Sequence, residues 1–148
     1  YLCGKKKNFY EKIKKFIKIH NIKDVVYLGT LSANNLKRYY LNCEAVVMPS
    51  RYESSSLVIL EGISNRKIII ASDISPNKEL LNNFKLYLFD LNKKNDLSYK
   101  FNEVLNLNSH KKKKIINHNL AKIDKYLWKN IALEYYKLLN EKLTKEND

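Results

Sequence analysis

The sequence contains few of the residues from which disulfides and metal centres are built. Its two cysteines, Cys3 and Cys43, lie far apart and form no C-x-x-C pair, and its three histidines form no H-E-x-x-H motif. Redox motifs and zinc sites show such spacings in the sequence. We therefore expect two reduced cysteines in the core and no bound metal.

Long apolar runs are also absent. The longest runs, such as residues 25–28 and 68–71, have the length of strands, whereas a transmembrane helix needs about 20 apolar residues. No secretory signal is recognisable at the N-terminus, where residues 1–4 read like the continuation of a longer chain. We therefore expect a cytoplasmic protein, and either a fragment or a truncated gene product.

Negative charge is scarce, since 28 Lys and Arg stand against 15 Asp and Glu, which gives a net charge of +13. This excess favours anionic partners such as nucleic acid, anionic lipid or a phosphorylated small molecule, but a solvated lysine surface explains it equally well. Most of the cations are Lys, whereas the planar fork of Arg suits base and phosphate recognition better. Zinc-knuckle, RNP and helix-turn-helix patterns are missing too, so we expect no nucleic-acid binding.

The first helix indicated by the pattern combines a basic face with an apolar stripe. Over residues 5–20 the apolar stripe has helical spacing and consists of Phe9, Ile13, Phe16, Ile17 and His20. The stripe can pack on a sheet, while the lysines around it can contact anionic lipid. We therefore predict a peripheral, salt-reversible contact with the inner face of the membrane.

The rest of the chain alternates between strands and helices. The pattern predicts strands over residues 25–29, 45–48, 68–71 and 85–89, and helices over residues 32–43, 54–64, 76–81, 96–107, 109–124 and 127–143. Such alternation is typical of an open parallel sheet flanked by helices. With 148 residues, 45% of them hydrophobic, the chain fits one Rossmann-like α/β domain with a helical C-terminal tail.

The residues that can carry chemistry lie at the carboxyl end of the second predicted strand, an edge where open parallel sheets bind ligands. Glu53 stands in a loop, and Glu61 lies eight positions later, about two turns along a helix that begins near Ser55. The backbone N–H groups of Ser55, Ser56 and Leu57 would point out of the helix start and attract a phosphate. The two carboxylates would accept hydrogen bonds from a sugar and a ribose. Alternatively, Glu61 is a surface residue and the serines are an N-cap.

The E-x7-E pair Glu53 and Glu61 occurs in a wider pattern. It is preceded by a V-x-P-S strand end and followed by Ala-Ser-Asp and Pro-x-x-Glu; the remaining matching segments are residues 25–29 and 36–40, Trp128, Tyr135 and Tyr136. Together these segments resemble the C-terminal, donor-binding domain of the group 1 (family 4) glycosyltransferases, which have the GT-B fold. The resemblance covers almost the whole chain, from Tyr1 to about Leu143.

The resemblance implies a retaining glycosyltransferase of hexosyltransferase type that uses a nucleotide-sugar as its donor substrate and needs neither a metal nor another cofactor. The acceptor is then a glycan or a lipid-linked sugar, as in polysaccharide biosynthesis. Glu53 is the implied catalytic carboxylate, in contact with hydroxyls of the transferred sugar, and Glu61 contacts the ribose. The implied donor-binding residues are Ser54, Ser55, Ser56, Leu57, Val58 and Glu61.

Glycine and proline are missing at three places where this family commonly has them. Serines 54–56 replace a Gly-Phe-Gly-like stretch, Asn65-Arg66-Lys67-Ile68 replaces a turn with glycine and proline, and Ile74-Ser75 replaces a pair of glycines. The phosphate-binding Arg and Lys of the family, and its acceptor domain, would precede Tyr1. We therefore expect one donor-binding domain, residues 1–148, that lacks its first strand–helix unit and its partner N-terminal domain and transfers no sugar alone.

Two other functions remain open at this point. The chain is either a non-catalytic module that holds a nucleotide or a partner, or a basic protein that binds nucleic acid or an anionic membrane and has the motif by coincidence. Salt-sensitive DNA binding without nucleotide-sugar binding would favour the last reading.

Overall fold

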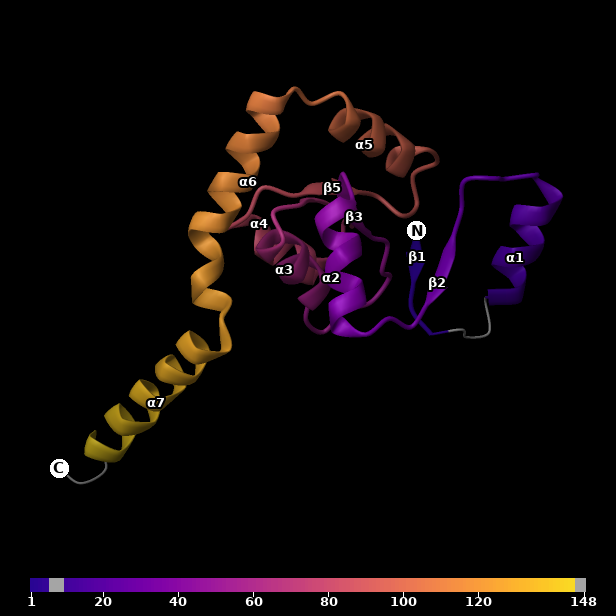
Figure 1. Cartoon of the computed structure of the whole chain (residues 1–148). Helices are drawn as coiled ribbons and strands as arrows, with labels where there is room; N and C mark the ends of the chain where they lie inside the picture. The colour runs from indigo at the N-terminus through magenta and orange to yellow at the C-terminus, as the bar shows by residue number, and fades with distance from the viewer. Residues whose placement is uncertain (6–9, 146–148) are drawn as a thin grey trace. The chain divides into compact units, whose positions relative to one another are not determined.

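The computed structural model describes residues 1–5 and 10–145, and the chain forms two compact units, residues 1–39 and 40–148. Figure 1 shows the helices and strands in chain order. The expectation of a single donor-binding domain over residues 1–148 stays a prediction.

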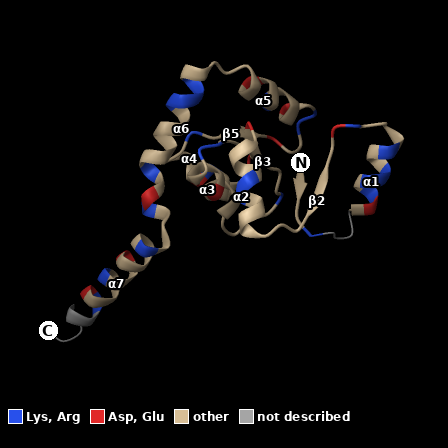
Figure 2. Ribbon diagram, in the orientation of Figure 1, with Lys and Arg blue, Asp and Glu red and all other residues tan. Residues whose placement is uncertain are grey.

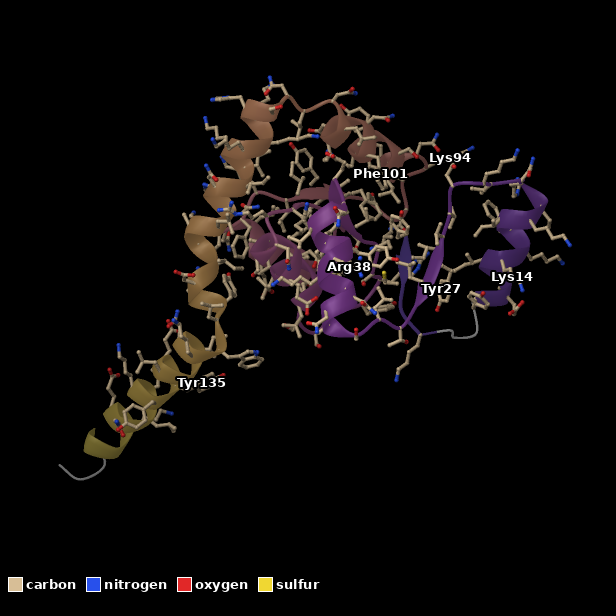
Figure 3. All side chains as sticks on the ribbon, in the orientation of Figure 1. Lys14, Tyr27, Arg38, Lys94, Phe101 and Tyr135 are labelled. Atoms are coloured by element: carbon tan, nitrogen blue, oxygen red, sulfur yellow. The ribbon has the colours of Figure 1, made fainter. Side chains whose placement is uncertain are left out.

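The first unit contains a two-stranded parallel sheet and a helix. Strands β1 (Leu2–Cys3) and β2 (Tyr27–Gly29) pair in parallel, and α1 (Tyr10–Ile19) connects them. The Tyr27 hydroxyl, on a side chain labelled in Figure 3, donates to the carbonyl of Gly4 at 2.5 Å.

In this unit one strand starts later than predicted, and part of the predicted first helix lies outside the described residues. The predicted strand starts at residue 25, but β2 starts at Tyr27, and Val25 and Val26 are exposed. The reason is that β2 has β1 as its single neighbour in the part of this unit that the structure describes. The start of the predicted first helix, with Phe9, lies outside the described residues.

Helix α2 (Ala33–Asn42) begins as predicted. The hydroxyl of Ser32 accepts a hydrogen bond from the amide of Asn35 at 3.4 Å, which confirms Ser32 as the cap. At the other end, the Lys67 ammonium donates to the carbonyls of Leu41 and Cys43 at 2.9 Å each. A cation at this position satisfies carbonyls that have no partner within the helix.

The second unit is built on a three-stranded parallel sheet with the order β3-β4-β5. These strands span Ala45–Met48, Ile68–Ser72 and Tyr87–Phe89. All five residues of the central strand β4 are buried. A parallel strand covered on both faces reads as a continuous apolar run, which is the pattern that predicted it.

Helices cover both faces of β4. Ile69 and Ala71 share a core with α3 (Leu57–Ser64) and with the end of α6 (Ser109–Ile123), while Ile68 and Ile70 share a second core with α5 (Asp96–Leu105). Each fully buried isoleucine stabilises the fold by about 1.5–3 kcal/mol relative to an exposed one. This arrangement confirms the predicted α/β class with a parallel sheet flanked by helices.

The chain ends in helices, as predicted. A short 3-10 helix (Asp124–Tyr126) leads to α7 (Trp128–Lys145), whose Trp128 is 78% exposed. Among the residues that the structure describes, no helix is long and apolar enough to cross a membrane. Both cysteines are free; Cys43 is partly buried, but Cys3 is exposed, so its assignment to the core was wrong.

After α3, an arginine takes the position at which the family commonly has a glycine. Arg66 has φ +62°. The amide of Arg66 donates to the carbonyl of Ile63, and the amide of Lys67 donates to the carbonyl of Gly62. This pair of hydrogen bonds defines a Schellman motif, in which glycine usually takes the left-handed position. The backbone turn is therefore kept, with an arginine in a conformation that costs an L-residue roughly 1–2 kcal/mol.

We predict that Arg66→Gly stabilises the protein. Relief of the left-handed strain exceeds the extra entropy that glycine gives the unfolded chain, so the free energy of unfolding should rise by about 0.5–1 kcal/mol. Chemical denaturation measures this change. The matched control is Ser64→Gly in the last turn of the same helix, which should lower the free energy of unfolding by about 0.5 kcal/mol. A decrease for Arg66→Gly would contradict the strain argument.

Candidate functional site

The candidate site lies at the carboxyl edge of the three-stranded sheet. Strands β3 and β4 are parallel and in register, with Met48 opposite Ala71, so the loops that follow them leave the sheet at one edge. The first loop carries Glu53 and leads to α3, and the second carries Asp73 and leads to α4 (Ser75–Leu81). This is the edge at which the sequence placed the chemistry.

Two adjoining hollows open at this edge. The larger, about 370 Å³, is lined by Arg51, Tyr52, Glu53, Asp73, Ile74, Ser75, Pro76 and Lys78. The smaller, about 200 Å³, shares four of these residues and extends toward the end of β5 through Asp90, Leu91 and Asn92. The larger falls within the usual range of ligand pockets, about 300–1,000 Å³.

The hollows contain charges of both signs. The Lys78 ammonium lies 3.1 Å from the Asp73 carboxylate, with both side chains at least one-third exposed, so this pair contributes little to stability. Arg51 lines both hollows, and the next residue, Tyr52, also lines both and is 90% exposed. Guanidinium, carboxylate and an exposed aromatic ring together suit a polar ligand with several hydroxyl groups.

The Glu44 carboxyl, whose pKa is lowered, lies at the opposite edge of the sheet. Lys112 of α6 donates a hydrogen bond to Glu44 at 3.0 Å, and this bond lowers the pKa of the Glu44 carboxyl. Because Glu44 precedes β3, the pair ties α6 to the amino end of the sheet and plays no part in the hollows.

The structure describes all the site residues predicted from the sequence, and among them Glu53 alone lines a hollow, the larger of the two. It is half-buried, while Glu61 is exposed on α3 and lines neither hollow. The hydroxyl of Tyr40 donates to Oε2 of Glu61 at 2.9 Å. The two carboxylates therefore have separate surroundings, and the structure does not place them in one pocket.

The start of α3 differs from the expectation. The helix begins at Leu57, with Ser56 as its N-cap, so Glu61 lies about one turn from the start, not two. The amide of Leu57 donates to the carbonyl of Ser55 at 3.0 Å and is not free for a ligand, as we had expected it to be. Ser54, Ser55, Leu57 and Val58 are exposed, whereas Ser56 is buried.

The sequence alone did not single out Arg51, Tyr52, Lys78, Asp90 and Asn92. The sequence did contain a signal for Arg51 as a site residue, since the chain has few arginines and this one stands two positions before Glu53. It contained no such signal for Asp90 and Asn92, because their position near the site depends on the pairing of β5 with β4. No group of three or more His, Cys, Asp or Glu side chains within residues 1–5 and 10–145 has the geometry to hold a metal ion.

Comparison with known proteins identifies the family of this chain. The family described as Glycosyl transferases group 1 matches residues 1–122. Two uncharacterized glycosyltransferases of Methanocaldococcus jannaschii are 26% identical over 133 residues and 27% identical over 111 residues. These alignments cover 89% and 74% of this chain, but 38% and 28% of the relatives.

Solved structures share the fold. The structure of HepE of Anabaena, in complex with UDP and glucose, matches this chain with a TM-score of 0.74 at 17% sequence identity. The structure of sucrose-phosphate synthase of Thermosynechococcus elongatus matches it with a TM-score of 0.79 at 19% sequence identity. Each similarity covers 97% of this chain, and 40% and 38% of the respective structures. The chain therefore spans less than half the length of these four proteins, and its Rossmann-like fold is that of half of a GT-B protein.

Proposed function

Because the chain belongs to the group 1 glycosyl transferases, we propose that it forms the donor-binding part of a retaining enzyme that transfers a hexose from a nucleoside diphosphate sugar. The acceptor in this proposal is a glycan or a lipid-linked sugar. The observation that supports it most is the half-buried Glu53 in a hollow of about 370 Å³ at the carboxyl ends of β3 and β4. Open parallel sheets bind ligands at this edge.

In this proposal the hollow receives the transferred sugar. Glu53 accepts hydrogen bonds from sugar hydroxyls and acts as the catalytic carboxylate, and charge-assisted bonds of this kind are roughly twice as strong as neutral ones. The ligand class is supported by the similar fold of HepE, whose structure contains UDP and glucose.

The diphosphate lies at the start of α3 in the same proposal. The loop and first turn, Ser54 to Val58, offer backbone N–H groups and the positive end of the helix dipole, with the Leu57 amide excepted because it is bonded to Ser55. Amides and cationic side chains can balance the charge of a leaving diphosphate, so the reaction needs no metal.

The nucleoside lies toward Glu61. Because the Tyr40 hydroxyl holds Oε2 of Glu61, the carboxylate has a fixed orientation and keeps Oε1 for a ribose hydroxyl. Sugar and ribose are then bound by separate carboxylates on either side of the helix start, as the E-x7-E spacing suggests.

We expect Glu61→Gln to weaken nucleoside diphosphate binding by about 1.5–3 kcal/mol, since charge-assisted hydrogen bonds to ribose are lost. Calorimetric titration of the 148-residue chain with UDP-, GDP- and ADP-sugars measures the affinity. Tyr40→Phe should produce a smaller loss, because the carboxylate remains but is no longer oriented. Glu103→Gln on α5, whose partner is Lys100, is the matched control and should bind like the parent. Unchanged affinity for Glu61→Gln would exclude the ribose role.

We further predict that the 148-residue chain shows no sugar transfer on its own. A missing electrostatic contact costs roughly 2.7–4 kcal/mol in the transition state, and lost positioning of the acceptor costs roughly 7–11 kcal/mol more. A coupled assay for nucleoside diphosphate release tests this, with and without the N-terminal half of a relative added in trans. Transfer restored in trans, and abolished by Glu53→Ala, is the expected result. Transfer by the chain alone would contradict the half-enzyme proposal, and donor binding with no transfer in either assay would favour the non-catalytic module.

We also propose that α1 makes a peripheral contact with the inner, anionic face of the membrane. Ile13, Phe16 and Ile19 are 44%, 56% and 65% exposed, and no residue from Tyr10 to Ile19 is buried. Lysines cluster on this helix, as the blue ribbon of Figure 2 and the labelled Lys14 of Figure 3 show. A basic amphipathic helix of this kind lies in the membrane interface.

The prediction is that the chain sediments with phosphatidylserine-containing vesicles at low salt and is released at high salt. Each lysine near the surface contributes about 1 kcal/mol, so Lys14→Gln, Lys15→Gln and Lys18→Gln together should abolish binding. The control removes the same charge from α6, through Lys111→Gln, Lys113→Gln and Lys114→Gln. Equal losses for both triple variants, or equal binding to neutral vesicles, would contradict a specific role of α1.

A further inference from the structure

Three buried polar side chains form one connected group beneath the loop that carries Glu53. Ser56, Ser72 and Asn77 are 5%, 0% and 0% exposed. They come from the N-cap of α3, the end of β4 and the first turns of α4. Burial of polar groups is unfavourable unless each has a partner, so their hydrogen bonds determine what the group does.

Hydrogen bonds of this group hold both ends of the loop that carries Glu53. The hydroxyl of Ser56 donates to Oδ1 of Asn77 at 2.5 Å, and Nδ2 of Asn77 donates to the carbonyl of Ser72 at 2.8 Å. The hydroxyl of Ser72 donates to the carbonyl of Ser50 at 2.5 Å. The loop is therefore held at residues 50 and 56, with Glu53 midway between its two anchors.

From this network we infer that Asn77 is a positioning residue for the donor site. It acts through Ser56, which it holds in place, so that the Glu53 loop and the first turn of α3 have the conformation that receives the donor. The inference rests on the proposed function for the identity of the ligand. It assigns a role to a residue that lines neither hollow and that the sequence pattern did not indicate.

An asparagine is required at this position for a chemical reason. Its amide offers an acceptor to Ser56 and a donor to Ser72 from one rigid plane. Aspartate has no donor for the Ser72 carbonyl and would bury a charge, and leucine has neither group. An unsatisfied buried donor or acceptor carries a full desolvation cost, so both partners would move away from an apolar replacement.

The same bond explains how a serine replaces a glycine at residue 56. Ser56 is the N-cap of α3, yet its side chain makes no capping hydrogen bond to the helix. Its hydroxyl donates to Asn77 instead, so the side chain points into the core, while Ser55 and Leu57 on either side of it are exposed. The side chain of Ser56 therefore does not extend toward a phosphate at the helix start, just as glycine has no side chain there.

The test is a double-mutant cycle on nucleoside diphosphate binding by the 148-residue chain, with UDP, GDP and ADP as probes. We expect Ser56→Ala and Asn77→Ala each to weaken the affinity about tenfold, and the double variant to be no weaker than Asn77→Ala, since the two residues share one bond. Asn119→Ala is the matched control, because Asn119 is also a buried asparagine that makes two hydrogen bonds, to the amide and carbonyl of Lys85. It should lower stability and leave the affinity unchanged.

The outcomes separate positioning from simple stabilisation. If Asn77→Ala loses stability like Asn119→Ala but binds like the parent, Asn77 is structural and the inference is wrong. If Asn77→Ala does not fold, the affinity of Ser56→Ala tests the inference in its place, with Ser64→Ala, at an exposed serine in the last turn of α3, as the control that should bind like the parent. A parent chain that binds none of the probes contradicts the proposed function instead. The network is then judged by amide hydrogen exchange of residues 51–55, which must accelerate in Ser56→Ala but not in Ser64→Ala.

Discussion

The burial of β4 on both faces is the constraint on which the second unit depends. Its isoleucines join two separate cores, one with α3 and one with α5, and strands β3 and β5 pair with it on either side. Because β4 cannot shift without disturbing both cores, its last residue, Ser72, is a fixed point at the carboxyl edge. The loops that build the candidate site are attached to this residue through hydrogen bonds from Asn77 and to Ser50.

The departures from the family pattern have different physical consequences. Arg66 replaces a glycine and keeps the left-handed turn, so the backbone is preserved with some strain. Ser56 replaces a glycine and gains a buried partner, Asn77, so the helix start is preserved by an added interaction. A change of residue type therefore does not imply a change of backbone, provided that another group compensates for the missing property.

The two glutamates of the E-x7-E pair are separated in environment as well as in sequence. Glu53 is half-buried in a hollow that also contains Arg51 and Lys78, while Glu61 is exposed and oriented by Tyr40. Carboxylates in such different surroundings can bind different parts of one ligand. This separation supports a donor with a sugar and a nucleoside on opposite sides of a phosphate group.

The sequence by itself determined the α/β class, the alternation of strands and helices from residue 25 onward and the place of Glu53 in the loop after residues 45–48, because these depend on apolar periodicity and on local spacing. It placed the start of α3 too early: residues 54–56 precede the helix, and the amide of Leu57, the first helical residue, donates to the carbonyl of Ser55. Tertiary structure alone decided that Arg51, Asp73 and Asp90 line adjoining hollows and that Asn77 is buried beside Ser56. These contacts join residues far apart in the chain, and they exist because parallel strands bring the loops that follow them to one edge of the sheet.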